Sequence, residues 1–134
     1  MTKTSEEQAL LNVNQQMLES VVSGDWTTYS SFCREDLTCF EAESNGSLAE
    51  GLAFHKFYFT LPKSSSNTDS SSTHINVTMV RPHVRWLSEH AAILSYTRLT
   101  QRMVDGVPMT ASCCETRVWD RSSGSWKQVH VHRS

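Results

Sequence analysis

The sequence lacks the features that mark membrane, nucleic-acid-binding and phosphate-transferring proteins. No apolar run approaches the roughly 18 residues that a membrane span needs, and the N-terminus has no signal-peptide pattern. With 12 basic and 14 acidic residues, the net charge of -2 gives no field that would attract nucleic acid or a membrane surface. A Gly-rich phosphate loop and the catalytic motifs of kinases are also missing. We therefore expect a soluble, cytoplasmic protein without phosphoryl-transfer activity.

Metal-site spacing is missing as well. The four cysteines are Cys33, Cys39, Cys113 and Cys114. Their spacing matches no zinc motif, and we predict reduced thiols, as is usual in the cytosol. His130 and His132 lie two residues apart on one face of a predicted strand, a spacing that can bind a metal, but no third ligand is near them in sequence. We predict no metal site and no cofactor.

The first half of the chain favours helices. Ser5 and Gln8 form a capping-box pattern, and apolar residues then recur at helical spacing until Gly24. Asp25 is a good N-cap for a short second helix. The sequence next predicts an extended segment at Leu37 to Glu43, a turn at Asn45-Gly46, and a short helix within Gly51 to Leu61.

The second half favours strands. Residues 62–73 are rich in serine and contain no apolar side chain that could anchor them, so we predict a flexible loop within a single domain of residues 1–134. After this loop, alternating apolar and polar residues predict strands at Ile75 to Val80, Val84 to Leu87, Ala91 to Met103, Met109 to Trp119 and Trp126 to His132. Helices followed by successive hairpins indicate an α+β fold, with a mainly antiparallel sheet curling around the first helix.

Three arginines occupy unusual positions on these strands. Arg98 shares a strand face with Tyr96, Arg117 shares one with Trp119, and Arg133 shares one with Val131. Burying a guanidinium without a partner costs several kcal/mol, so a cavity that holds all three must also hold negative groups. Two alternatives fit: internal pairing with Glu41, Glu43 or Glu115, or a bound anion such as a carboxylate or phosphate.

Several segments, taken together, resemble the association or hub domain of calcium/calmodulin-dependent protein kinase II. In chain order the segments are Gly24-Asp25-Trp26, Leu37 to Glu41, Glu50-Gly51, Phe54 to Phe59, Pro82-His83-Val84, Tyr96 to Gln101, Glu115 to Trp119 and Val129 to Ser134. The resemblance runs from about Ser5 to the last residue. It implies the cone fold shared with nuclear transport factor 2 and ketosteroid isomerase, in which a strongly curved sheet wraps a long N-terminal helix.

The resemblance also implies a function. Hub domains assemble dimers into two stacked rings of identical subunits, and kinase subunits of the same family are the candidate partners. Carried over residue by residue, Arg98, Arg117 and Arg133 match arginines deep in the hub pocket. Tyr29 and His55 match positions that line this pocket, where small carboxylates bind. The acidic groups of a peptide, such as another protein's acidic tail, are an alternative ligand.

We therefore expect a free-standing, non-catalytic hub whose strand tryptophans, Trp86, Trp119 and Trp126, are buried between subunits. The alternative is an isomerase or hydratase of the same cone fold. Such an enzyme needs a general base in the pocket, and arginines, which stay protonated, are poor bases. His55 together with Tyr29 keeps this alternative open.

Overall fold

The computed structural model describes residues 4–60 and 74–134 and contains three α-helices, one short 3₁₀ helix and six strands within them. In chain order these are α1 (Ser5–Ser23), α2 (Trp26–Ser31), β1 (Cys33–Phe40), η1 (Ala42–Ser44), β2 (Ala49–Glu50), α3 (Leu52–Thr60), β3 (Ile75–Ser88), β4 (Ala91–Val104), β5 (Val107–Asp120) and β6 (Lys127–Arg133). The predicted α+β class is confirmed. The predicted loop at 62–73 lies outside the described residues.

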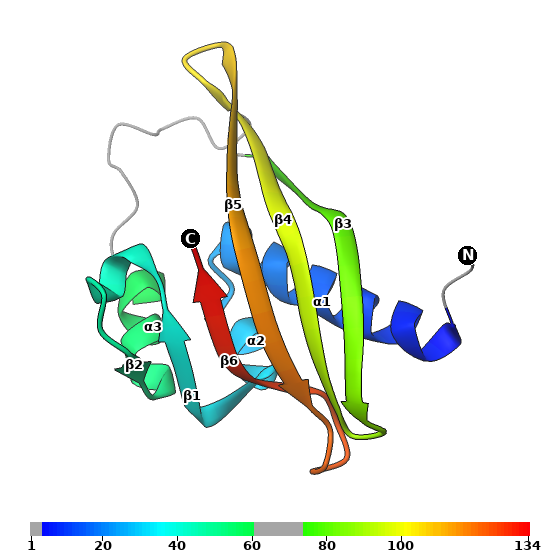
Figure 1. Cartoon of the computed structure of the whole chain (residues 1–134). Helices are drawn as coiled ribbons and strands as arrows, with labels where there is room; N and C mark the ends of the chain where they lie inside the picture. Colours follow the sequence, from blue (N-terminus) through cyan, green and yellow to red (C-terminus); the bar gives the residue numbers. More distant parts are fainter. Residues whose placement is uncertain (1–3, 61–73) are drawn as a thin grey trace.

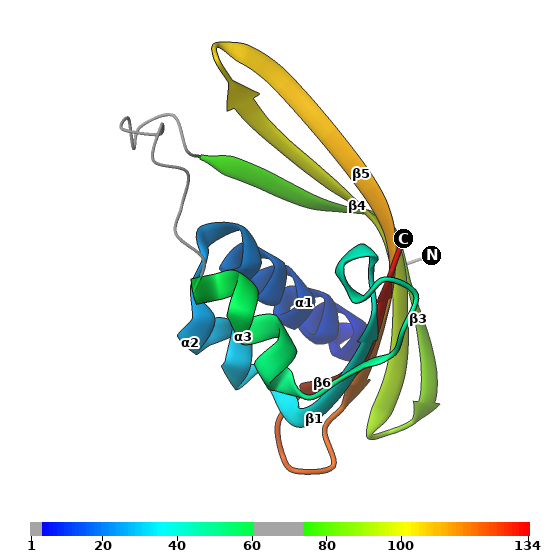
Figure 2. The same cartoon turned by 90° about the vertical axis from the view of Figure 1, so that its left-hand side faces the viewer.

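The six strands form one mainly antiparallel sheet in the order β2-β1-β6-β5-β4-β3. Only β1 and β6 pair in parallel, and β3, β4 and β5 form the long meander expected from the sequence. Figure 2 shows the sheet bending around α1, with α2 and α3 on the same side. The long strands run side by side past α1 in Figure 1, and the β4–β5 hairpin extends beyond the helices. None of the helices in residues 4–60 is long and apolar enough to cross a membrane.

The N-terminal helices begin and end close to where the sequence predicts. The capping residue of α1 is Thr4, one position before the expected Ser5, and its side-chain oxygen accepts a hydrogen bond from the Glu7 amide at 3.1 Å. Gly24 ends the helix in the left-handed conformation, with φ 71°, which suits a residue without a Cβ. Asp25 caps α2 as predicted, accepting from the Thr28 amide.

Two expected strands are a single strand in the structure. The predicted strands on either side of Arg81-Pro82 join into β3, with a register shift between Val80 and His83 and a positive φ of 54° at Arg81. A bulge lets the chain continue through a proline because β3 is an edge strand, where a missing backbone donor costs no sheet hydrogen bond. The prediction of a break at this point is wrong.

The strand predicted at Leu37 to Glu43 is shifted. It begins at Cys33, which pairs with Gln128 of β6 ahead of an irregularity that spans the charged residues, and it ends at Phe40. The 3₁₀ helix η1 then replaces the expected extended end. This turn brings Glu41 and Glu43 toward the open end of the sheet.

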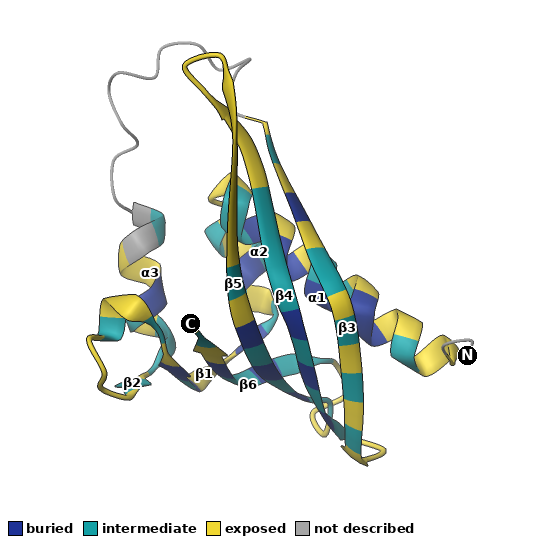
Figure 3. Ribbon diagram, turned by 45° about the horizontal axis from the view of Figure 1, so that its top comes forward, coloured by how far each residue is buried: buried dark blue, intermediate teal, exposed yellow. Residues whose placement is uncertain are grey.

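The hydrophobic core lies between α1 and the concave face of the sheet, where Figure 3 shows the buried segments of the long strands. Its largest fully buried side chain, Trp119 on β5, donates its indole N–H to Asn14 Oδ1 of α1 at 3.1 Å. Both residues are 0% exposed, so this hydrogen bond ties the helix to the sheet inside the core.

The expectation that the strand tryptophans are buried between subunits is therefore wrong for Trp119, which lies in the core of the single chain. Trp86 and Trp126 are half-buried, and their rings contact each other with centroids 6.0 Å apart. The Arg121 guanidinium lies over both rings, 5.8 Å from the Trp86 centroid and 4.8 Å from that of Trp126. These two side chains also have substantial packing within the chain.

We predict that Asn14→Ala lowers the free energy of unfolding by about 1–3 kcal/mol, because the buried Trp119 N–H loses its acceptor. Chemical denaturation followed by tryptophan fluorescence measures the change. Asn12→Ala, at an exposed position of the same helix, is the matched control and should change stability by less than about 0.5 kcal/mol. Equal effects of the two variants would contradict the role given to Asn14.

Candidate functional site

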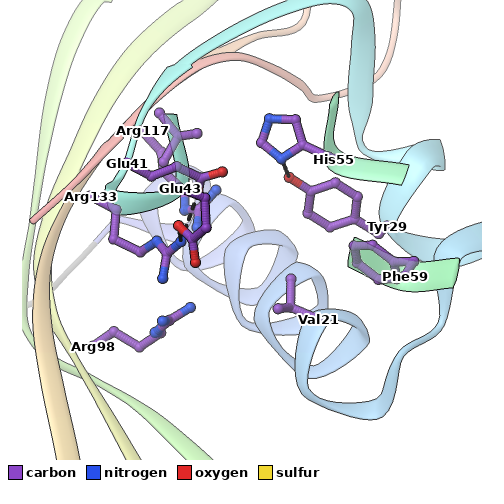
Figure 4. A pocket seen from close by; sticks show the side chains of 10 residues that line it. Val21, Tyr29, Glu41, Glu43, His55, Phe59, Arg98, Arg117 and Arg133 are labelled. Carbon is purple, nitrogen blue, oxygen red and sulfur yellow. Dashed lines mark hydrogen bonds and ion pairs between the residues drawn. The ribbon is translucent and has the colours of Figure 1, made fainter. Parts of the chain in front are cut away.

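A cavity of about 230 Å³ opens between the concave face of the sheet and the helices. In Figure 4, charged side chains from the sheet and the η1 turn gather on one side, and aromatic side chains from α2 and α3 lie on the other. The lining consists of Val21, Tyr29, Glu41, Glu43, His55, Phe59, Arg98, Arg117, Val131 and Arg133. All five predicted site residues are thus brought to one cavity from five different elements.

The floor of the cavity is a buried ion-pair network centred on Glu115, whose side chain is fully buried. One carboxylate oxygen, Oε1, accepts from Arg117 Nε at 3.1 Å and Nη2 at 3.0 Å, and also from the Tyr96 hydroxyl. The other, Oε2, lies 3.1 Å from Arg98 Nη1. Burial alone would raise the pKa of Glu115, but the two guanidiniums outweigh it and hold the pKa below its usual value.

Arg117 has hydrogen-bond partners on several sides. Besides the two bonds to Glu115, its Nε donates to the Tyr96 hydroxyl at 3.0 Å, and its Nη1 donates to Gln128 Oε1 at 2.7 Å. Burial would lower the pKa of Arg117, but the Glu115 carboxylate raises it well above its usual value. Arg117 is therefore a fixed cation of the floor, held by three neighbouring strands.

Arg133 lies at the mouth of the cavity and is less enclosed. Its Nη2 donates to Glu41 Oε2 at 2.8 Å and to Glu43 Oε1 at 2.7 Å, and its side chain is 26% exposed. Although it is the penultimate residue, its backbone is fixed, because Ser134 and Cys114 exchange two backbone hydrogen bonds of 2.9 and 2.8 Å. The end of the chain is docked on β5.

Arg98 completes the cationic side. Its Nη1 pairs with Glu115, but its Nε is buried without a hydrogen-bond partner in the described part of the chain. Such a donor is uncommon in folded proteins, since an unsatisfied buried N–H costs about 1–3 kcal/mol. It leaves one donor near the cavity available for an acceptor.

The opposite wall is aromatic. The Tyr29 hydroxyl and His55 Nδ1 are 3.2 Å apart, and the two rings stack with centroids at 5.9 Å. Phe59 packs against Tyr29 with a centroid distance of 5.0 Å. Burial raises the pKa of the Tyr29 phenol and lowers the pKa of the His55 imidazole, so both groups are neutral at pH 7.

The charges of the cavity balance. Three arginines and three glutamates, the latter being Glu41, Glu43 and Glu115, carry formal charges that cancel. The internal pairing that the sequence left open is therefore present, and every arginine of the site has at least one carboxylate partner. Any anion that enters must compete with a glutamate already in place.

Sequence reasoning missed several parts of the site. Gln128, which orients Arg117, gives no signal in the sequence, whereas Glu115 was one of the three carboxylates that the sequence offered as partners of the arginines, and it lies two residues before Arg117 on the same strand face. His130 bonds through Nδ1 to Thr38 Oγ1 at 2.7 Å and packs on Phe40. In residues 4–60 and 74–134, the side chains grouped closely enough to hold a metal ion belong instead to Cys39, Glu41 and His55.

The family to which this architecture belongs is identified by sequence comparison. The model of the calcium/calmodulin dependent protein kinase II association domain matches residues 6–134. The chain belongs to this family. A characterised relative, the delta subunit of calcium/calmodulin-dependent protein kinase type II from Oryctolagus cuniculus, is 42% identical over 128 residues, which are 95% of the chain and 23% of that subunit. The association domain is the non-catalytic hub portion of such kinases and serves oligomerisation.

Solved structures agree with this assignment. The calcium/calmodulin-dependent protein kinase II hub homology domain of Chlamydomonas reinhardtii is 44% identical, with a TM-score of 0.90 over 98% of both chains. The association domain from C. elegans is 36% identical, with a TM-score of 0.84 over 97% of this chain and 95% of that one. A putative ketosteroid isomerase from Shewanella frigidimarina, 18% identical with a TM-score of 0.64 over 92% of both chains, shows the shared cone fold alone.

We predict that Glu115→Gln lowers the free energy of unfolding by about 3–5 kcal/mol at pH 7, because it leaves two buried guanidiniums without their shared counterion. The folded-state pKa of Glu115 lies below the ordinary 4.5, so the stabilisation is complete above about pH 4.5 and is lost as the pH falls through the folded value. The difference between wild type and variant should therefore shrink in acid. Chemical denaturation across this pH range checks it, and a difference that does not depend on pH would contradict it.

Proposed function

We propose that this chain is a self-assembling hub that forms dimers and stacks them in two rings. Family membership supports the oligomerisation role, and three solved relatives that are 36% to 44% identical to the chain are hub or association domains. Because the family match spans residues 6–134, we propose one domain for the whole chain. The described cysteines, which are all four in the chain, are free thiols, in keeping with a cytoplasmic location.

The observation that carries this proposal is an exposed apolar surface at the end of the β4–β5 hairpin. We define the hairpin tip as Met103, Val104, Val107 and Met109, which are 50%, 44%, 56% and 51% exposed. These are four of the eight large apolar side chains exposed in the described residues. The tip projects beyond the helices, where nothing in the described chain covers it (Figures 2 and 3). A cluster of this kind is typical of a surface that another subunit covers.

The length of the kinase relative suggests a second kind of partner besides copies of this chain. In the delta subunit of the rabbit kinase, the matched region is 23% of the length, so most of that protein lies outside the hub. We propose that kinase subunits of the same family join assemblies of this chain through their own hub domains. An isomerase or hydratase activity is not favoured, because three solved relatives at 36% to 44% identity are hub or association domains.

We further propose that the cavity binds a small carboxylate at its mouth. Arg133 supports this, since its guanidinium is partly exposed and can exchange Glu43, whose side chain is 38% exposed, for a ligand. Arg98 supports it too, because its buried Nε lacks an acceptor among the described residues. Arg117 contributes only by shaping the floor, since its donors already have acceptors in Glu115, Tyr96 and Gln128. Charge-assisted bonds to a carboxylate give the ligand its affinity.

We predict that Val107→Glu and Met103→Glu each shift the particle to a smaller species, because a charge at the tip must be desolvated when a second copy covers it. Size-exclusion chromatography with light scattering measures the mass, against 15.2 kDa for one chain. Ser123→Glu, in the exposed β5–β6 turn, is the charge-matched control and should leave the mass unchanged. Wild-type protein that runs as a single chain would end the hub proposal. Tip variants with unchanged mass would remove the hairpin from the interface.

For the carboxylate site, we predict opposite effects of two variants on the affinity for butyrate. Arg133→Gln should weaken binding about 10- to 100-fold, as expected for losing a charge-assisted bond of about 1.5–3 kcal/mol. Glu43→Gln should strengthen it, because the ligand no longer competes with that carboxylate. Isothermal titration calorimetry measures both, and Arg102→Gln, on the exposed part of β4, is the control. Equal affinity in all four proteins would refute the site.

A further inference from the structure

Two residues that line the cavity, Glu41 and His55, form a second group of side chains together with Cys39. Cys39 lies on β1, Glu41 lies just beyond the end of that strand, and His55 lies on α3. One ligand atom from each side chain, a thiol sulfur, a carboxylate oxygen and an imidazole nitrogen, can be chosen so that all three lie within 4.8 Å of one another. Cys39 is 0% exposed and His55 is 7% exposed, so the cluster is enclosed.

His55 provides an independent observation that points to a missing ligand. Its Nδ1 is engaged by the Tyr29 hydroxyl, whereas its Nε2 is buried and has no hydrogen-bond partner among the described residues. When Nδ1 donates its proton to the hydroxyl oxygen, Nε2 carries a free lone pair. A histidine held by a hydrogen bond at one ring nitrogen, with the other nitrogen free, is the arrangement found at metal sites in proteins.

The nearby arginines do not preclude a cation. Glu41 Oε2 accepts a hydrogen bond from Arg133 Nη2, and the Glu41 carboxylate also interacts with the Cys39 thiol. If Glu41 turns to a metal, Arg133 keeps Glu43 as its partner at 2.7 Å. A divalent ion and the Cys39 thiolate together add a net charge of +1 to the cavity, because the charge of Glu41 already balances an arginine. The proton displaced from the Cys39 thiol passes to solvent.

We propose that Cys39, Glu41 and His55 form a binding site for a zinc-like divalent transition metal. The mixed sulfur, nitrogen and oxygen donors match the ligands of Zn²⁺ and Co²⁺, whereas Mg²⁺ and Ca²⁺ are bound by oxygen ligands. Three protein ligands leave one coordination position for water or for a small molecule in the cavity. This inference does not depend on self-assembly or on carboxylate binding, because none of the three ligands is an arginine or a residue of the hairpin tip.

Cobalt titration of the full chain, without carboxylate in the buffer, tests the site. Co²⁺ substitutes for Zn²⁺, and a bound thiolate gives it an intense charge-transfer absorption. We expect this band to saturate at one Co²⁺ per chain, to disappear when Zn²⁺ is added, and to be lost in Cys39→Ala. His55→Gln should weaken binding by about tenfold or more. Cys114→Ser, which removes an exposed thiol outside the cluster, is the control and should keep the band.

Two results would overturn the proposal: no charge-transfer band in the wild type, or a band that survives in both Cys39→Ala and His55→Gln. Circular dichroism and thermal melting of each variant without metal distinguish a lost site from a lost fold. Should Cys39→Ala unfold, the band of His55→Gln and the zinc competition in the wild type decide the question. Because Arg133→Gln keeps all three ligands, its Co²⁺ band should persist even where butyrate binding fails.

Discussion

The buried carboxylate of Glu115 is the interaction on which the concave face of the sheet depends. It neutralises Arg117 beside it on β5 and Arg98 on β4, and it accepts a hydrogen bond from Tyr96. Guanidiniums in such a position would be too costly to desolvate without a shared counterion. By joining these side chains, the carboxylate makes a polar floor within an otherwise apolar sheet and leaves a hollow above it, between sheet and helices.

The cavity combines a fixed part with an adjustable part. Arg117 has partners on several sides, including Gln128 on β6, so it contributes shape and charge balance. Arg133 is held at the mouth by two glutamates at the η1 turn, of which Glu43 is partly exposed. Because an exposed ion pair contributes little free energy, Arg133 can exchange Glu43 for another anion. The same turn brings Glu41 close to Cys39 and His55. One short segment therefore influences both the proposed anion site and the proposed metal site.

The proposed assembly surface and the proposed ligand site lie on different parts of the same sheet. The concave side packs on α1 through the core and closes the cavity, while β4 and β5 continue past the helices as an exposed hairpin with an apolar tip (Figure 2). Because the two are separate, substitutions at the hairpin tip can change the proposed assembly surface without disturbing the Glu115 network. It also explains why a cone fold shared with a putative isomerase can belong to a hub domain: the fold fixes the frame, and the side chains of the cavity and the surface of the hairpin decide what it does.

The sequence by itself determined the α+β class, the first two helices and the hairpins from β4 onward, because these follow from local periodicity, caps and turns. Its alternation also placed the three arginines on apolar strand faces, and the resemblance to hub domains pointed to the family. The tertiary structure alone decided that Arg81-Pro82 is a bulge, since edge position is a property of the sheet, and that Trp119 belongs to the core. Only the tertiary structure shows that Gln128 bonds to Arg117 and that Cys39 lies near His55. These residues meet through strand pairing and helix packing, which local sequence patterns do not predict.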